Sequence, residues 1–442
     1  EFAHQARRSG FDGIMMHFAH GWLFHDFLSP LSNHRADEFG GSVENRCRFP
    51  LMALKAVREV IGDDLLIELR LNGNDEMEGG ITPEDAAQQA LIFQDYADMI
   101  HITCSTRLDV TSRPRMTPTS FFPTEHNAYA SAIVKNTPGV RIPIGAVGAI
   151  GNPERAEKLL EDGKADYLLI ARAAIADNDW VNKVKAGREE DIRPCLRCSL
   201  CLDHGRRKSK IQGKELVMAS EVSFDRMCAV NPLSMQGAVK NRFPAPARRK
   251  KIVVVGGGVA GMNAALSAAN RGHEVLLYEK TDKLGGQALL SDGMWFKKEM
   301  KAYHEWLERQ VRKNPNIFVV TNTEVTPETV SEIDPDATIV AVGAKQIVPS
   351  IPGIEKAAMA FDVFGNEDKV GKKVVIIGGG DIGCELSIHL AEKGHDCTVV
   401  ELTHFQAGNA ELCIRMSILQ FMEKNNVTTL LDTKATEITD EG

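Results

Sequence analysis

Apolar and polar residues alternate in blocks along the first 190 residues. Short apolar runs at 65–71, 99–102, 142–147 and 167–171 predict strands, and residues 11–16 predict an earlier one. Apolar residues at helical spacing predict helices over 45–61 and from Pro83 and Pro153, with Thr82 as the N-cap before Pro83. Strands that alternate with helices in this way predict a parallel sheet with crossover helices.

The number of strands leaves two architectures open. A closed (β/α)8 barrel needs eight strands, and we count about five. The pattern alone therefore fits either an open α/β sheet or part of a barrel.

A change in composition divides the rest of the chain. Residues 191–247 are polar and loop-rich and end in Phe-Pro-Ala-Pro-Ala, a linker composition. The α/β alternation then resumes in two units, so we predict segments at 1–190, 191–247, 248–366 and 367–442. The last unit is still alternating where the sequence ends, and we expect a chain truncated at both ends.

Composition narrows the class of protein. The 442 residues carry a formal net charge of −8, which argues against a nucleic-acid partner because phosphate binding needs a basic surface. No run of about 18 apolar residues predicts a membrane span, and the first residues lack the features of a secretory signal. Nine cysteines, an odd number, fit a reducing cytoplasm better than a disulfide framework. We expect a cytoplasmic protein with no membrane partner.

Two glycine motifs each follow a predicted strand and open a helix. They are Gly256-Gly257-Gly258-Val259-Ala260-Gly261 and Gly378-Gly379-Gly380-Asp381-Ile382-Gly383. The first glycine of such a motif makes the tight turn, the third lets backbone approach a pyrophosphate, and the last lets helix pack on strand. Both units are therefore predicted to bind dinucleotides.

An acid ends the second strand of each unit, Glu279 in one and Glu401 in the other. A carboxylate at this place accepts hydrogen bonds from ribose hydroxyls. It also repels a 2′-phosphate, so Glu401 favours NADH over NADPH in the second unit.

Four cysteines are candidate metal ligands: Cys195, Cys198, Cys201 and, further along, Cys228. Three thiolates separated by two residues each can reach one iron–sulfur cluster. Zinc is the alternative, because four cysteines also bind zinc. The neighbouring dinucleotide motifs favour the redox cluster.

Residues 17–23, 27–30 and 33–42 resemble the fourth-strand signature of the Old Yellow Enzyme family. With the cysteines and both glycine motifs, the whole chain resembles the multidomain branch that includes 2,4-dienoyl-CoA reductase, 2-enoate reductase and trimethylamine dehydrogenase. The resemblance implies a TIM (β/α)8 barrel without its first strands, an iron–sulfur segment and two Rossmann-like domains. It also implies FMN in the barrel, FAD in 248–366, NAD(H) in 367–442 and a 4Fe–4S cluster between the flavins.

The resemblance further implies cofactor contacts. Arg70 matches the arginine near flavin N1 and O2, where positive charge stabilises the reduced flavin. The residues that match the FMN phosphate site are Gly148, Ala171 and Arg172, and those that match the FAD-contacting turn are Gly286 and Gln287. Ala149 stands where the family often has an arginine.

The same resemblance assigns the substrate site. His17 and His20 match the pair that hydrogen-bonds the substrate carbonyl, which makes the β-carbon electrophilic toward hydride. Two buried histidines with satisfied hydrogen bonds are the structural alternative. Trp22 replaces the family's proton-donating tyrosine, and its indole N–H is not a usable acid. The proton must then come from solvent or from another residue, or is not needed. His25 is the first candidate residue, ahead of His101 and His126.

These matches imply an NADH-dependent ene reductase in a homo-oligomer. Electrons would run from NADH to FAD, through the cluster to FMN, and as hydride to the activated C=C bond of an enone, enoate or enoyl thioester. An amine dehydrogenase or desaturase running oxidatively is one alternative, although His17 stands where we expect tyrosine in the amine-oxidising relatives. An electron-transfer flavoprotein subunit is another, and an intact His17, His20 and Arg70 set argues against it.

Overall fold

The computed structural model describes residues 1–202, 228–234 and 245–441. These residues divide into two compact units, Glu1–Ala174 and Ile175–Gly442. None of the described helices is both long and apolar enough to cross a membrane.

The first unit is built on a five-stranded parallel sheet whose strands follow one another in chain order. The strands are β1 (Gly13–Phe18), β2 (Leu66–Asn74), β3 (Met99–Cys104), β4 (Ile144–Ala146) and β5 (Tyr167–Leu168). Strictly sequential neighbours are typical of a (β/α)8 barrel, whereas an open doubly wound sheet reverses its order at a switch point. The order therefore identifies consecutive strands of a barrel, as the resemblance implies.

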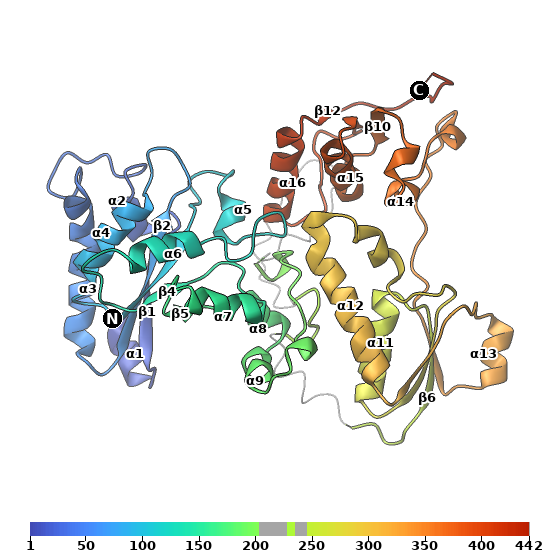
Figure 1. Ribbon diagram of the computed structural model, residues 1–442, viewed down its shortest axis with the longest axis horizontal. Coiled ribbons are helices and arrows are strands. Elements are labelled where there is room, and N and C mark those ends of the chain that lie inside the picture. The colour runs from blue at the N-terminus through green and yellow to red at the C-terminus, as the bar shows by residue number, and fades with distance from the viewer. Residues whose placement is uncertain (203–227, 235–244, 442) are drawn as a thin grey trace. The chain divides into compact units, whose positions relative to one another are not determined.

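Helices α3 (Val43–Ile61), α4 (Pro83–Phe93) and α6 (Ala128–Lys135) cover one face of this sheet (Figure 1). Thr82 caps α4 in a capping box with Asp85, as its sequence predicts. The other helices of the unit are α1 (Phe2–Arg8), α2 (Leu23–Leu28), α5 (Arg113–Met116), α7 (Pro153–Glu161) and α8 (Arg172–Ala176), which ends just inside the second unit.

Alternate strand residues form the core against these helices. Ile67, Leu69, Ile100, Ile102 and Ile144 are completely buried there, and each such side chain contributes about 1.5–3 kcal/mol of burial. Because side chains alternate along a strand, the residues between them face the other side of the sheet. That second face is polar and holds the candidate site.

The second unit contains two further parallel sheets. The first has the order β8-β7-β6-β9, with β6 (Lys251–Val255), β7 (Glu274–Tyr278), β8 (Ile317–Val320) and β9 (Ala337–Val340). The other has the order β10-β11-β12, with β10 (Lys373–Ile377), β11 (Asp396–Val400) and β12 (Thr428–Leu430). Both have the Rossmann-like character that the glycine motifs predict.

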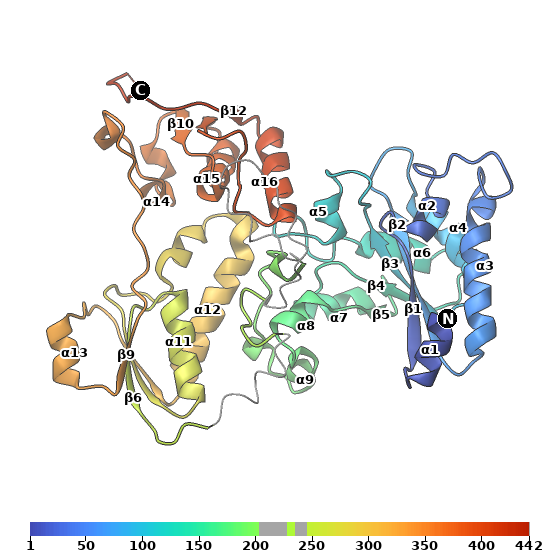
Figure 2. The same ribbon diagram turned by 180° about the vertical axis from the view of Figure 1, so that it is seen from behind.

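Helices α11 (Val259–Asn270) and α12 (Lys298–Lys313) lie beside the first of these sheets, as Figure 2 shows from behind. Met262 and Leu307 from these helices are fully buried against Val254 and Leu277 of the strands. Among the described residues, the remaining α-helices are α9 (Trp180–Lys185), α13 (Pro327–Ile333), α14 (Ala360–Val363), α15 (Asp381–Glu392) and α16 (Leu412–Lys424).

Some element boundaries differ from the sequence prediction. The first strand runs from Gly13 to Phe18 rather than over 11–16, because its ladder with β2 begins at the pair Gly13 and Leu66. The shift places His17 inside the strand. Helix α11 begins at Val259, directly after its N-cap Gly258, so the glycine motif opens the helix as predicted.

Candidate active site

Five residues from five strands form one row across the polar face of the first sheet. His17 pairs in register with Arg70, Arg70 with His101, His101 with Gly145 and Gly145 with Tyr167. In-register residues of neighbouring strands point to the same face. We call these five residues the inner row.

Three nitrogen atoms of the inner row are buried without a hydrogen-bond partner among the described residues: His17 Nδ1, Arg70 Nε and His101 Nε2. A buried polar atom without a partner costs about 1–3 kcal/mol. Three of them together are typical of a site that binds a polar ligand. Arg70 Nε is a donor, whereas a neutral His101 that donates from Nδ1 to Glu68 presents an acceptor at Nε2. The set fits the polar edge of a flavin, which offers both hydrogen-bond acceptors and an N–H donor.

The row is electrostatically unusual. Burial, with help from the positive charge of Arg70, lowers the pKa of His17 to about 4. Burial also lowers the pKa of Arg70, but an arginine remains charged at neutral pH. The site therefore combines a neutral imidazole with a fixed positive charge.

His20 lies at the turn that follows β1. Both His20 (φ 66°) and Gly21 (φ 72°) have left-handed backbone conformations. The two imidazole rings of His17 and His20 come to 5.2 Å between centroids. The structure thus brings the predicted pair together.

The hydrogen bonds of His20 favour one tautomer. Its Nε2 lies 2.9 Å from Thr103 Oγ1, and Asn127 Nδ2 donates to the same oxygen at 3.5 Å. The hydroxyl proton of Thr103 is then free to bond His20 Nε2, which leaves the ring proton on Nδ1. Burial and the charge of Arg70 lower the pKa of His20, so this ring is also neutral.

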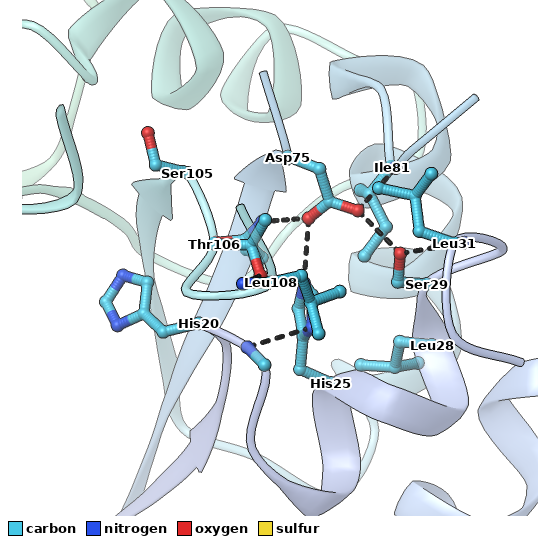
Figure 3. A network of polar contacts seen from close by, with 12 residues as sticks. His20, His25, Leu28, Ser29, Leu31, Asp75, Ile81, Ser105, Thr106 and Leu108 are labelled. Atoms are coloured by element: carbon cyan, nitrogen blue, oxygen red, sulfur yellow. Dashed lines mark hydrogen bonds and ion pairs between the residues drawn. The ribbon is translucent and has the colours of Figure 1, made fainter. Parts of the chain in front are cut away.

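His25 is held by protein on both ring nitrogens (Figure 3). Its Nδ1 accepts the N–H of Gly21 at 3.0 Å, and its Nε2 lies 2.7 Å from Asp75 Oδ1. Asp75 also accepts hydrogen bonds from Ser29 and from the backbone of Ile81. This geometry favours a positioning role for His25 at the Gly21 turn over the proton-donating role expected from the sequence.

Trp22 lies at the edge of this turn, with its side chain about half exposed (52%). The Arg107 guanidinium lies 4.3 Å from the centre of its ring. Two residues of the loop after β3 contact Glu76, which follows β2. His126 Nε2 lies 2.6 Å from Glu76 Oε1, and Arg115 Nε forms an ion pair with Glu76 Oε2 at 2.9 Å. His126 and Arg115 are therefore engaged with protein.

The residues expected at the FMN phosphate follow β4 and β5. Gly148 has a φ of 126°, and a side chain there would meet the amide of Asn127 at 3.0 Å. Arg172 donates from Nη2 to the Pro118 carbonyl at 2.9 Å, while its Nη1 is buried without a partner among the described residues. Ala171 is exposed next to it. A buried guanidinium nitrogen without an acceptor fits a phosphate oxygen.

The sequence prediction missed Glu68 and Tyr167. Glu68 Oε1 accepts hydrogen bonds from His101 Nδ1 and from the Tyr167 hydroxyl, each at 2.9 Å. The sequence held one signal that could have identified Glu68 as a site residue. Glu68 and Arg70 are two residues apart in a predicted strand, so their side chains lie on the same face of the sheet.

The two glycine motifs have nearly the same geometry. Gly256 and Gly378 have φ values of 106° and 107°. A side chain at Gly261 would overlap the Gly256 carbonyl oxygen, and one at Gly383 would overlap that of Gly378. Gly258 and Gly380 are the N-caps of α11 and α15.

Each acid bonds the glycine turn of its own motif. Glu279 accepts the N–H of Gly257, and Glu401 that of Gly379, both at 2.7 Å. Burial acts to raise the pKa of both acids, but bonds from backbone N–H groups outweigh it and leave each pKa lowered. Both carboxylates are ionised at neutral pH.

The turn that contains Gly286 lies next to the first motif. A Cβ atom added at Gly258 would lie 3.8 Å from the Cα atom of Gly286. Gln287 donates from Nε2 to the Ala344 carbonyl at 2.6 Å.

The cysteine loop is shaped by two left-handed residues, Arg197 (φ 52°) and Ser199 (φ 56°). The N–H of Arg197 donates to Cys195 Sγ at 3.4 Å, and its buried guanidinium bonds Glu299 of α12. Cys195 and Cys228 pack against the same hydrophobic core, although they are far apart in sequence.

Cys198 and Cys201 are partly buried in the same loop. Within the part of the chain that the structure describes, no three His, Cys, Asp or Glu side chains converge into a metal-binding group. The 4Fe–4S assignment therefore stays a prediction from cysteine spacing.

Two known protein families match this chain, one in its N-terminal part and the other in its C-terminal part. Residues 1–191 match the NADH:flavin oxidoreductase / NADH oxidase family, and residues 250–442 match the pyridine nucleotide-disulphide oxidoreductase family. The chain belongs to the multidomain NADH:flavin oxidoreductases. The resemblance to the multidomain Old Yellow Enzyme branch is thereby confirmed, and the two families support FMN-binding and FAD- and NAD-binding regions.

Similar proteins match nearly the whole length of this chain. It is 34% identical to the NADH oxidase of Thermoanaerobacter brockii over 99% of this chain and 65% of the relative. It is 30% identical to the cinnamate reductase of Clostridium sporogenes over 100% of this chain and 66% of the relative. A 2-naphthoyl-CoA reductase solved with 2-naphthoyl-CoA has a TM-score of 0.88 at 30% identity, over 100% of this chain and 64% of that one. The chain thus spans about two thirds of the length of these proteins.

Proposed function

We propose that the protein is an NADH-dependent ene reductase that acts on a C=C bond conjugated to a carbonyl. The observation that supports this most is the pair of neutral imidazoles, His17 and His20, beside the buried charge of Arg70. Two of the relatives are named as reductases of cinnamate and of 2-naphthoyl-CoA, and both compounds hold a C=C bond conjugated to a carbonyl.

The chain's own residues would hold four redox groups. Arg70, Gly148 and Arg172 fit FMN, whose N5 supplies hydride when the flavin is bound and reduced. The two glycine motifs, with Glu279 and Glu401, would hold FAD and NAD(H). Cys195, Cys198, Cys201 and Cys228 would hold a 4Fe–4S cluster, which supplies one-electron transfer between flavins.

The two imidazoles would act on the substrate carbonyl. Each is neutral and keeps one ring N–H, which it can donate to the carbonyl oxygen. Donation withdraws electron density from the conjugated bond and makes the β-carbon electrophilic. A preorganised donor of this kind is worth about 3–4 kcal/mol in a buried site.

Proton delivery to the α-carbon would come from solvent. Trp22 has no titratable proton, and both nitrogens of His25 are engaged with protein. The exposed edge of Trp22 leaves this side of the turn open to water.

The test is an anaerobic assay of the full-length protein. NADH oxidation is followed with enones and enoyl thioesters and compared with no substrate. We expect saturable oxidation with a saturated product, and His20→Ala, which removes one of the two donors, should lower kcat about 100-fold. Trp22→Tyr should raise the rate if solvent protonation limits it.

Two results would overturn this proposal. No acceleration by any conjugated carbonyl, with flavin reduced on addition of amines, would favour the oxidative alternative. NADH-dependent reduction of an electron-accepting protein by wild type and His20→Ala alike would favour the electron-transfer subunit.

We also propose the segment limits 1–190, 191–247, 248–366 and 367–442, a homo-oligomeric state and a cytoplasmic location. Light scattering on the full-length protein tests the oligomeric state, and a monomer would exclude it.

A further inference from the structure

The polar face of the first sheet contains a hydrogen-bonded group that the proposed reaction does not use. His101 Nδ1 and the Tyr167 hydroxyl both donate to one oxygen of Glu68. His101 is completely buried, and Tyr167 and Glu68 are partly buried. These hydrogen bonds link three strands, β2, β3 and β5, and the bond from Tyr167 crosses β4 and β3 to reach β2.

Gly145 makes this arrangement sterically feasible. It lies between His101 and Tyr167 in the inner row, and a side chain there would come within 2.5 Å of Tyr167 Cζ. The absence of a side chain lets the tyrosine ring cross β4 and reach Glu68. The glycine, the tyrosine and the glutamate therefore form one structural unit.

Glu68 is ionised in this group. The hydrogen bond from His101 lowers the pKa of Glu68. Burial lowers the pKa of His101, and burial together with Glu68 raises the pKa of Tyr167. His101 and Tyr167 are thus neutral donors, and Glu68 carries the negative charge.

The negative charge of Glu68 affects the pKa of Arg70. Glu68 lies two residues before Arg70 on the same strand and face, and it acts to raise the pKa of Arg70 against the effect of burial. The other titratable groups facing this region are His17 on β1 and His101 on β3, both neutral. Glu68 therefore offsets the positive charge that Arg70 presents to the site.

We propose that Glu68 is a positioning and charge-balancing residue that, with His101 and Tyr167, limits how strongly Arg70 stabilises negative charge on the bound flavin. This inference rests on the proposed FMN site at Arg70. It assigns the potential of that flavin to the balance of charge between Glu68 and Arg70 rather than to Arg70 alone.

The experiment measures the midpoint potential of bound FMN in the full-length protein, before and after removal of FAD. Glu68→Gln removes the negative charge and should shift the potential to more positive values. We expect about a tenfold change in the ratio of reduced to oxidised FMN at a fixed potential. Glu76→Gln is the matched control, because Glu76 also bonds a histidine but does not act on Arg70.

Tyr167→Phe is the second variant and keeps every charge in place. It removes a donor that disperses the charge of Glu68, so the potential should shift slightly to more negative values. Opposite shifts in Glu68→Gln and Tyr167→Phe support the proposal, and Tyr167→Phe tests it alone if Glu68→Gln does not fold. A purely structural group would lower the thermal stability of both variants without opposite shifts, and that result would overturn the inference. Wild-type protein that binds no FMN would instead refute the proposed function.

Discussion

The two glycine motifs of the second unit share a backbone geometry but differ in what surrounds it. Helix α11 begins with Val259, whereas α15 begins with Asp381 at the same place after the N-cap. The turn beside the first motif contributes Leu284, which is 1% exposed. The corresponding turn of the second contributes Gln406, whose Nε2 has no partner among the described residues.

This difference suggests how the same motif serves two purposes. An apolar wall and an uncharged helix start favour a nucleotide that stays bound, as we propose for FAD. A carboxyl group at the helix start competes with a pyrophosphate for the same N–H groups. Weaker binding suits a nucleotide that must leave after each turnover, as we propose for NAD(H).

The largest effects are expected from Gly261→Ala and Gly383→Ala. Each added methyl group overlaps a carbonyl oxygen of its own motif and must move the turn. Gly261→Ala should purify without FAD. Gly383→Ala should keep FAD but lose about 100-fold in the rate of flavin reduction by NADH.

Flavin content and stopped-flow reduction measure both variants. Gly293→Ala is the control, since a side chain there meets nothing within 4 Å. If Gly383→Ala also lost FAD, the two motifs would not be independent sites.

Asp381→Asn should have the next largest effect. Burial raises the pKa of Asp381, and ionisation places a negative charge beside the expected pyrophosphate. The KM for NADH of the wild type should therefore rise as pH increases through that pKa. The variant should show a KM about fivefold lower at high pH and little pH dependence, with kcat unchanged. A variant KM that still rises with pH would assign the effect to another group.

Glu401→Gln should change the choice of nucleotide. Loss of the negative charge removes repulsion of a 2′-phosphate, so the preference for NADH over NADPH should fall about threefold. Glu279→Gln is the matched control in the first motif and should leave this preference unchanged. Steady-state kcat/KM values for both nucleotides provide the measurement, and an equal change in both variants would refute the assignment.

Thr281→Val and Thr403→Val should have the smallest effects. Each threonine hydroxyl donates to the acid of its own motif at 2.9 Å, and loss of one such bond costs about 1 kcal/mol. The acids have lowered pKa values, so their stabilisation is present above the unfolded pKa and is lost as pH falls through the folded pKa. Both variants should unfold at slightly higher pH in an acid titration followed by circular dichroism. Unchanged acid stability would show that the hydroxyls contribute nothing.

Features that are local in sequence were predictable here. The turn, helix start and acid of each glycine motif lie within about 25 residues, and hydrophobic spacing is enough to place them. The N-cap at Thr82 follows from three neighbouring residues in the same way.

Features that depend on strand register were not predictable. Glu68 and Tyr167 are 99 positions apart, and their contact depends on the order of five strands and on the absence of a side chain at Gly145. The role of His25 likewise depends on Asp75, 50 positions away. Composition and periodicity carry no information about such pairings.

The left-handed backbone at His20 has an evolutionary consequence. A side chain in this conformation costs about 1 kcal/mol relative to glycine. Exchange of His20 for glycine would relieve that strain but would also remove the buried bond to Thr103 Oγ1, which costs about as much. Selection for heat resistance alone should therefore leave this position nearly neutral, whereas selection for turnover should keep the histidine.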